Sequence, residues 1–164
     1  MAIQIIVDGY NLIGARAGLR GNLERQREAL LERLQRYHDR RGHPIIVVFD
    51  GWRSGWINEI EEKRDGLTVI FSRQGEKADD VIQRLAREFG DASVVVSSDR
   101  ELQLAVQQTG ATVVYASEFE RKLRQAGSVE PGPDPSEPPR AEKKGNPRKL
   151  SKSERKRRQR LGRL

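Results

Sequence analysis

The chain has 164 residues and a formal net charge of +7, and it has no cysteine, which excludes disulfides and thiolate zinc sites. This length suits one ordinary domain, and the sequence shows neither a secretory signal nor an apolar run of the roughly 20 residues that a membrane span needs, so we expect a cytoplasmic protein without a membrane partner. The charge excess lies in residues 127–164, which hold 12 basic and 5 acidic residues, whereas residues 1–126 hold 19 of each.

Short apolar runs alternate with amphipathic segments in the first part of the chain. The runs predict strands, and the spacing of apolar residues in the other segments predicts helices. The predicted strands are 3–7, 45–49, 67–71, 93–96 and 112–115, and the predicted helices are about 22–41, 77–89, 99–108 and 117–125. We also expect a short charged helix in the second half of 52–64. Because this alternation is typical of βαβ units, the fold class is α/β, with about five strands in a mainly parallel sheet flanked by helices.

Composition divides the chain into three parts. Residues 1–126 form the predicted folded domain, and the proline-rich residues 127–147 predict a flexible linker. Residues 148–164 form a basic tail that we expect to be helical only when bound, because its apolar surface is too small for it to fold alone. A basic tail beside an electrically neutral domain points to a polyanionic partner, with a solubilising extension as the alternative.

Acidic residues recur where the predicted strands end or where the next helix begins. They are Asp8, Asp50, Asp79 and Asp99. The carboxyl ends of parallel strands share one edge of a sheet, and ligands bind at that edge. Carboxylates that meet there repel one another unless a cation joins them, and hard divalent cations prefer oxygen ligands. The pattern therefore indicates a metal-dependent enzyme that acts on phosphodiesters.

Several residues of these segments also have an ordinary structural explanation. Asp79 and Asp99 lie at predicted helix starts, where carboxylates cap backbone N–H groups or interact with the helix dipole, and Asn11 could cap a helix in the same way. Of the adjacent aspartates, we expect Asp79 to face the site and Asp80 to support it, because neighbouring helical side chains point about 100° apart. A shared site explains the whole set better than independent caps do.

The acidic segments form motifs that resemble those of a known family. The motifs are Asp-Gly-Tyr-Asn at 8–11, Phe-Asp-Gly at 49–51, Ala-Asp-Asp-Val-Ile at 78–82 and Ser-Ser-Asp at 97–99. In this order they resemble the NYN-domain family, and more narrowly its bacterial YacP-like branch, which is related to PIN-domain nucleases. The resemblance covers about residues 2–125. It implies a Rossmann-like PIN fold, dependence on Mg²⁺ or Mn²⁺, and endoribonuclease activity, which in some members is linked to messenger RNA on translating ribosomes.

The resemblance also implies the residues of the site. Catalysis and metal binding fall to Asp8, Asp50, Asp79 and Asp99, with Asn11 also catalytic and with Glu76, Asp80, Ser97 and Ser98 in support. We expect metal held by the carboxylates to activate a water, so that hydrolysis leaves a 5′-phosphate and a 3′-hydroxyl.

Basic and aromatic residues near the motifs and in the tail are expected to bind the RNA. They are Arg16, Arg20, Trp52, Arg53, Arg73, Arg100, Lys149, Lys152, Arg155, Lys156, Arg157 and Arg158. Of the two tryptophans, Trp52 and Trp56, Trp52 is the better candidate for stacking on a base. The alternative is that its ring packs in the core. A bacterial receiver domain is disfavoured, because it needs an aspartate after the third strand, where Ser72 lies. The main rival is a non-catalytic module that binds RNA or the ribosome.

Overall fold

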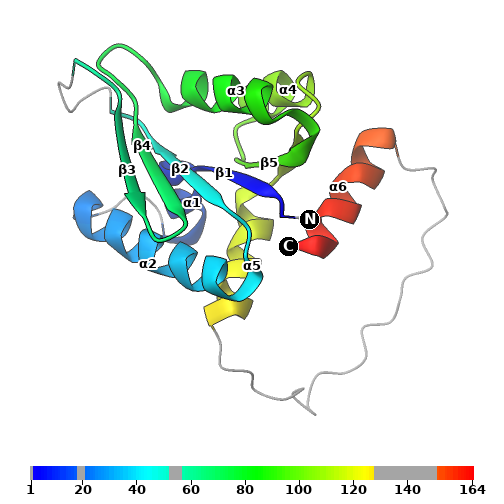
Figure 1. Ribbon diagram of the computed structural model, residues 1–164, viewed down its shortest axis with the longest axis horizontal. Helices are drawn as coiled ribbons and strands as arrows, with labels where there is room; N and C mark the ends of the chain where they lie inside the picture. The colour runs from blue at the N-terminus through cyan, green and yellow to red at the C-terminus, as the bar shows by residue number, and fades with distance from the viewer. Residues whose placement is uncertain (1, 18–20, 52–56, 128–150) are drawn as a thin grey trace.

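A six-stranded sheet forms the centre of the protein (Figure 1). The computed structural model describes residues 2–17, 21–51, 57–127 and 151–164. The strand order is β3-β4-β2-β1-β5-β6, and each neighbouring pair is parallel except β3 with β4. The strands are β1 (Gln4–Asp8), β2 (Ile45–Phe49), β3 (Ile60–Arg64), β4 (Leu67–Phe71), β5 (Ser93–Val96) and β6 (Thr112–Val114). The predicted α/β class with a mainly parallel sheet is confirmed.

Helices cover both faces of this sheet. In Figure 1, α3 and α4 lie on one face, whereas α1, α2 and α5 lie on the other. The helices are α1 (Gly9–Ala17), α2 (Leu23–Arg41), α3 (Ala78–Phe89), α4 (Arg100–Gln107), α5 (Ala116–Gly127) and α6 (Lys152–Arg163), with a short 3-10 turn at Gly90–Ala92. Within the described residues, no helix is long and apolar enough to cross a membrane.

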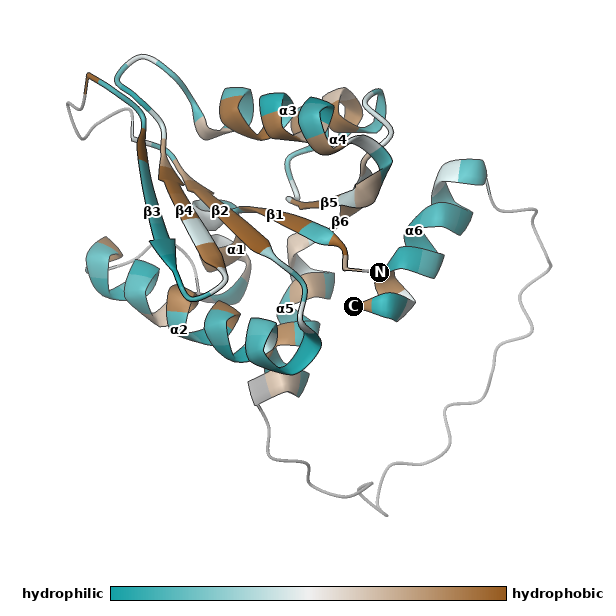
Figure 2. Ribbon diagram, in the orientation of Figure 1, coloured by the Kyte–Doolittle hydropathy of each residue, from teal (hydrophilic) through white to brown (hydrophobic). Residues whose placement is uncertain are grey.

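The strand side chains divide between two cores. In β1, Ile5 and Val7 pack toward α1, α2 and α5, whereas Ile6 between them packs toward α3 and α4. In β2, Phe49 belongs to the first core and Val48 to the second. Burial on both faces explains why these strands are continuous apolar runs, which appear brown in Figure 2.

The prediction of a charged helix in the second half of 52–64 is wrong. Residues Ile60–Arg64 form the edge strand β3, which pairs antiparallel with β4 in the register that places Ile60 opposite Phe71. The sheet therefore has one strand more than expected. An Asp65-Gly66 turn joins the two strands, with φ of 34° and 90°, and Asp-Gly is typical of a tight hairpin. Because the outward side chains of β3 are exposed and charged, the strand lacks the apolar pattern that would have predicted it.

Helix α1 begins directly after β1. Its first residue, Gly9, lies against the ring of Phe49, and a Cβ on Gly9 would come within 2.3 Å of a ring carbon. Glycine is required here because the helix approaches β2 closely. This contact fixes the direction in which the chain leaves Asp8.

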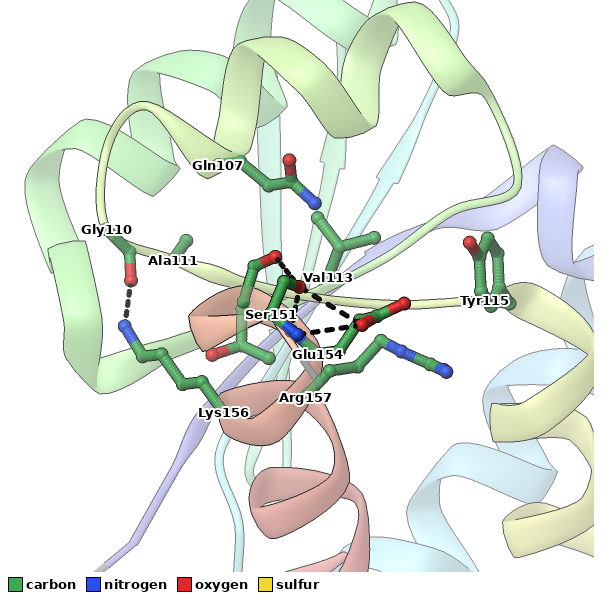
Figure 3. Close-up of a pocket in the computed structure, with 11 residues that line it drawn as sticks. Gln107, Gly110, Ala111, Val113, Tyr115, Ser151, Glu154, Lys156 and Arg157 are labelled. Atoms are coloured by element: carbon green, nitrogen blue, oxygen red, sulfur yellow. Dashed lines mark hydrogen bonds between the residues drawn. The ribbon is translucent and has the colours of Figure 1, made fainter. Parts of the chain in front are cut away.

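Helix α6 is attached to the sheet by polar contacts that the sequence did not predict. The Lys156 ammonium donates to the carbonyl of Gly110 at 2.6 Å, as Figure 3 shows, and the Arg160 guanidinium donates to the carbonyl of Asp91 at 2.9 Å. Both carbonyls precede strands, β6 and β5 respectively. The helix starts with a reciprocal capping box between Ser151 and Glu154.

The end of α6 also enters the apolar core on the α2 and α5 side of the sheet. Leu164 is 1% exposed and Leu161 packs against the same cluster. The Tyr37 hydroxyl donates to the Leu164 carbonyl at 3.1 Å. The basic tail was expected to become helical on binding a partner. Its described part, residues 151–164, instead packs against the folded domain of the same chain.

Candidate active site

Strand alternation places two of the predicted carboxylates on one face of the sheet. Asp8 follows Ile6 by two residues and Asp50 follows Val48 by two residues, so both point toward the side covered by α3 and α4. The register pairs Asp8 with Val48, and Asp50 therefore lies about 7 Å further along the strand direction. Asp8 is consequently the deeper of the two, and Asp50 is exposed at the rim.

Asp8 lies in an environment that disfavours its charge. It is only 9% exposed. Burial and the negative charge of Asp79 raise its pKa to about 7, with a smaller contribution from Asp99. Hydrogen bonds from the Asn11 backbone N–H and from the Ser97 hydroxyl, at 3.5 Å, oppose the shift without cancelling it. A proton bound to Asp8 would neutralise this unfavourable charge, and a cation beside it would offset the charge.

Asp79 connects the remaining carboxylates electrostatically. It lies in the first turn of α3, and its pKa is raised by burial, then by the charges of Asp99, Asp80 and Asp50, against a lowering effect of Lys77. The structure thus brings the four predicted ligands into one acidic region. Asp80 accepts a hydrogen bond from the Lys77 backbone N–H at 3.2 Å, so the adjacent aspartates do have different local roles.

Asp99 combines the two roles considered for it. Its Oδ1 atom accepts hydrogen bonds from the backbone N–H groups of Glu101 at 3.0 Å and Leu102 at 3.4 Å, and it therefore caps α4. The same carboxylate raises the pKa values of Asp8 and Asp79. Because both capping bonds use one oxygen, the other oxygen can serve a ligand.

Asn11, Ser97 and Ser98 connect the start of α1 to the loop between β5 and α4. The Ser98 backbone N–H donates to Asn11 Oδ1 at 2.8 Å, and the Asp99 backbone N–H donates to Ser97 Oγ at 3.1 Å. The side-chain oxygen of Asn11 is thus engaged within the protein, whereas its amide NH₂ group can donate to a phosphate.

Ser72 is a residue of the site that the motifs did not indicate. Its fully buried hydroxyl accepts a hydrogen bond from the Gly51 backbone N–H at 2.9 Å and donates to the Glu76 carbonyl at 2.7 Å. Ser72 therefore ties the loop that carries Asp50 to the loop that leads to Asp79. The signal in the sequence was a small polar residue directly after an apolar strand.

Glu76 and Arg73, predicted respectively as a supporting and an RNA-binding residue, lie in an ion-pair network. The Glu76 carboxylate lies 3.1 Å from Arg73 and 3.4 Å from Arg84, and Arg84 also lies 2.5 Å from Glu59. Glu76 thus has cationic partners of its own beside the acidic region.

The other predicted RNA-binding residues have different surroundings. Arg16 lies 3.9 Å from the buried Glu120, and the exposed Arg100 begins α4 next to Asp99. Arg20, Trp52, Arg53 and Lys149 lie outside the described residues.

The basic residues of α6 divide between docking and exposure. Lys156 binds the Gly110 carbonyl (Figure 3). Arg157 pairs with Glu118, and its guanidinium lies 5.1 Å from the centre of the Tyr115 ring. The exposed basic residues are Arg163 and three of the predicted tail contacts, Lys152, Arg155 and Arg158. These three are the predicted tail contacts that the described structure leaves open to a polyanion.

The chemistry of the acidic region fits a hard divalent cation. Carboxylate oxygens are the preferred ligands of Mg²⁺ and also suit Mn²⁺, and both Asp79 and Asp99 already act unfavourably on Asp8. As the described residues are placed, no three His, Cys, Asp or Glu side chains could hold one ion together. Mg²⁺ usually keeps several waters and uses one or two carboxylates, so a more open arrangement suits it.

Comparison with known proteins extends the likeness beyond the motifs. The profile of the YacP-like NYN domain matches residues 5–163, which include α6. The protein named "Uncharacterized protein YacP" of Bacillus subtilis (strain 168) is 31% identical over 128 residues, covering 73% of this chain and 74% of the relative.

Solved structures agree with the sequence match. Two crystal structures of Rae1 (YacP) from Bacillus subtilis, the first of a single-residue variant, superpose with TM-scores of 0.65 and 0.63 at 30% and 29% identity. The matches cover 76% and 77% of this chain and 77% and 76% of those chains. With a family profile that spans nearly all of the sequence and a fold shared at this identity, the chain belongs to the YacP-like NYN domain family.

Proposed function

We propose that this protein is a metal-dependent endoribonuclease that hydrolyses phosphodiester bonds in single-stranded RNA, including messenger RNA on ribosomes. The observation that carries the proposal is the electrostatic state of Asp8, a buried carboxylate that Asp79 and Asp99 make still less favourable. Membership of the family implies a nuclease-type domain. Metal-dependent hydrolysis of a phosphodiester needs clustered carboxylates to hold the metal.

The proposed roles follow from the surroundings of each side chain. Asp8, Asp79, Asp99 and, at the exposed rim, Asp50 would hold Mg²⁺ or Mn²⁺, each ion through one or two carboxylates and several waters, because no three of these side chains converge on one point among the described residues. The cation would supply charge neutralisation at the scissile phosphate and activation of a water. The Asn11 amide would donate to a phosphate oxygen. Ser97 and Ser98 would keep the loop of Asp99 in position beside Asp8 through their hydrogen bonds.

Histidine has no part in the proposed chemistry. His43 Nδ1 accepts a hydrogen bond from the Ile3 backbone N–H at 3.1 Å, and its Nε2 lies 3.3 Å from the Arg163 carbonyl. Both contacts are at the amino-terminal edge of the sheet, opposite the carboxylates. His38 lies in the last turn of α2 and bonds to the His43 carbonyl at 2.7 Å.

An enzyme explains the acidic region better than a binding module does. RNA is a polyanion, so a pocket of carboxylates weakens RNA binding unless a cation is present. The exposed residues Lys152, Arg155 and Arg158 would supply attraction that does not depend on sequence. We further propose that the partners are RNA and the ribosome and that the activity is cytoplasmic.

The test is a cleavage assay with free single-stranded RNA and with ribosome-bound messenger RNA. Each substrate is incubated with the full chain in Mn²⁺, Mg²⁺ or EDTA, beside Asp8→Asn. Products with 5′-phosphates that appear only with a divalent cation and only with Asp8 support the nuclease. RNA that stays intact in every reaction while still binding the protein would identify a non-catalytic binding module instead.

A further inference from the structure

Tyr10 belongs to the first motif, yet the acidic site gives it no role. Its ring packs against Phe49 with the ring centres 5.1 Å apart, and its hydroxyl accepts a hydrogen bond from Arg27 Nη1 at 3.0 Å. The Arg27 guanidinium also lies over the Phe71 ring, 5.8 Å from its centre. Arg27 comes from α2 and is held by two aromatic residues of other elements.

These contacts place Arg27 at the same edge of the sheet as the carboxylates. Tyr10 follows Asp8 by two residues, and Phe49 directly precedes Asp50. Phe71 ends β4 and is level with Phe49 in the register. The aromatic side chains lie on the α2 face, whereas the acidic region lies on the α3 face. A strand of RNA that crosses this edge would pass from the carboxylates to Arg27.

Arg27 forms no ion pair among the described residues, although its charge contributes to lowering the pKa of the neighbouring Glu28, which pairs with Arg64. Other arginines around the sheet are paired: Arg33 with Glu120 at 2.5 Å, and Arg64 with Glu28 at 3.0 Å. Among the described residues Arg27 makes no ion pair, and its contacts are with a neutral hydroxyl and an aromatic face. A guanidinium has five N–H donors and matches the geometry of a phosphate, so most of its donors are available to a ligand.

We propose that Arg27, oriented by Tyr10 and Phe71, binds a backbone phosphate of the RNA next to the one at the acidic site. The fixed orientation reduces the entropy lost when the side chain binds its ligand. The inference rests on the proposed function and deepens it, because it assigns a substrate contact on the side of the sheet away from the carboxylates. It also gives Tyr10 a positioning role that its ring packing alone does not require.

The test separates binding from cleavage. A short labelled single-stranded RNA is titrated with the Asp8→Asn protein, with which we expect the RNA to stay intact, and with the same protein carrying Arg27→Gln, over a series of KCl concentrations. We expect Arg27→Gln to weaken binding about tenfold and to lower the slope of log K against log salt by about 0.7, the value for one lost phosphate contact with a single strand. In the protein that retains Asp8, KM should rise while kcat stays within about twofold.

Matched variants control for charge and for folding. Arg36→Gln removes an equal charge from an exposed position on the same helix, where the partner Glu32 is 4.0 Å away, and should leave affinity and slope unchanged. Tyr10→Phe keeps the ring and removes the hydroxyl, and it should weaken binding in the same direction by less. Arg27→Lys keeps the charge but loses the paired N–H donors of the guanidinium. Compared with Arg27→Gln, it should restore the salt slope but only part of the affinity.

The outcomes distinguish this inference from the proposed function. Cooperative unfolding of Arg27→Gln would show that the variant is folded. If this folded variant binds RNA with the affinity and the salt slope of its parent, Arg27 is only a structural contact and the inference is wrong. Cleavage that still depends on Asp8 would leave the proposed function standing in that case. If the protein binds RNA with Arg27-dependent slope but never cleaves it, the inference holds and the nuclease proposal fails. If the parent binds no RNA at all, both are wrong.

Discussion

At the scale of single residues, the acidic site is defined by how unequal its carboxylates are. Asp8 is nearly buried and its pKa is raised to about 7, whereas Asp50 is exposed at the rim. Asp79 lies between these extremes, with a pKa raised by burial and by Asp99. Such inequality is common at functional sites, where burial and like charges are combined in one place. It leads directly to a dependence of stability on pH.

We expect the protein without divalent cations to lose stability as the pH rises from about 4 to about 7. The pKa of Asp8 is raised from its ordinary value of 3.8 to about 7 on folding, so the folded state holds a proton that the unfolded state releases. The stabilisation is complete below the ordinary pKa and is lost as the pH passes the raised one. The loss amounts to at most roughly 4 kcal/mol, and Asp79 adds to it with the same sign.

Urea unfolding at a series of pH values in EDTA measures this loss. Asp8→Asn removes the titrating group while keeping the shape, so it should be more stable than the parent at pH 8 and should show a flatter profile. Parallel profiles for the two proteins would show that Asp8 does not titrate in this range. Added Mn²⁺ should restore stability chiefly above pH 7, where the carboxylate is ionised.

We expect Ser72→Ala to loosen the site as well as to lower stability. It removes the hydrogen bonds to Gly51 and Glu76, which join the loops of Asp50 and Asp79, and leaves a buried N–H without its partner. The cost should be about 1–3 kcal/mol in unfolding free energy, together with a several-fold loss of Mn²⁺ affinity. Ser93→Ala is a matched control, because Ser93 is equally buried and donates to Gly90 at 2.8 Å at the opposite edge. Equal metal affinity in the two variants would show that Ser72 supports only the fold.

At the scale of elements, close packing at the ends of strands decides where helices begin. Helix α1 starts at the residue after β1 because Gly9 has no side chain to collide with Phe49. The same start brings the Asn11 backbone N–H to the Asp8 carboxylate. The beginning of one helix thus sets the conformation of the central carboxylate.

Gly9→Ala should therefore destabilise the protein although alanine favours helices. The new Cβ would lie 2.3 Å from a carbon of the Phe49 ring, which is fully buried between the Tyr10 and Phe71 rings. Overpacking of this kind typically costs about 1–3 kcal/mol. Gly162→Ala on α6 meets nothing within 4 Å and should be neutral or stabilising by up to about 1 kcal/mol. Thermal and urea unfolding of both variants compares them, and equal stability would contradict the close approach.

At the scale of the whole molecule, α6 connects the end of the chain to the sheet. Its polar contacts reach carbonyls before β5 and β6, and its final residue enters the core beside Tyr37. If the tail made no such contacts, substitutions in it would change RNA binding but would leave the stability of the domain unchanged. A docked helix affects the stability of the domain as well.

Leu164→Ala should lower the stability of the domain by about 2 kcal/mol, within the range for a buried leucine. Leu164 is 1% exposed. Its truncation leaves a cavity beside Tyr37 and removes apolar contacts that attach α6 to the core. Leu104→Ala is the control, since Leu104 on α4 is 56% exposed and should change stability little. Urea unfolding, followed by the domain's own circular dichroism, compares the two. An unchanged midpoint for Leu164→Ala would mean that α6 does not contribute to the folded domain.

The sequence by itself determined the α/β class, the parallel strands and the gathering of acidic residues at one edge. Apolar runs and helical periodicity are local signals, and the rule that carboxyl ends share an edge then places Asp8, Asp50 and Asp99 without further information. Capping is equally local: the Asn22 side chain accepts hydrogen bonds from the Glu24 and Arg25 backbone N–H groups at the start of α2.

Only the tertiary structure decided which surfaces meet. The charged strand β3 carries little apolar pattern and forms because β4 offers it a hydrogen-bonding edge. The bridging hydroxyl of Ser72 and the Tyr10–Arg27 contact join segments that the chain separates by at least a loop, so no local signal reports them. The docking of α6 depends on carbonyls and apolar surface that exist only once the sheet has formed. Sequence periodicity indicates what each segment becomes, whereas contacts between distant segments depend on the groups that remain unsatisfied after folding.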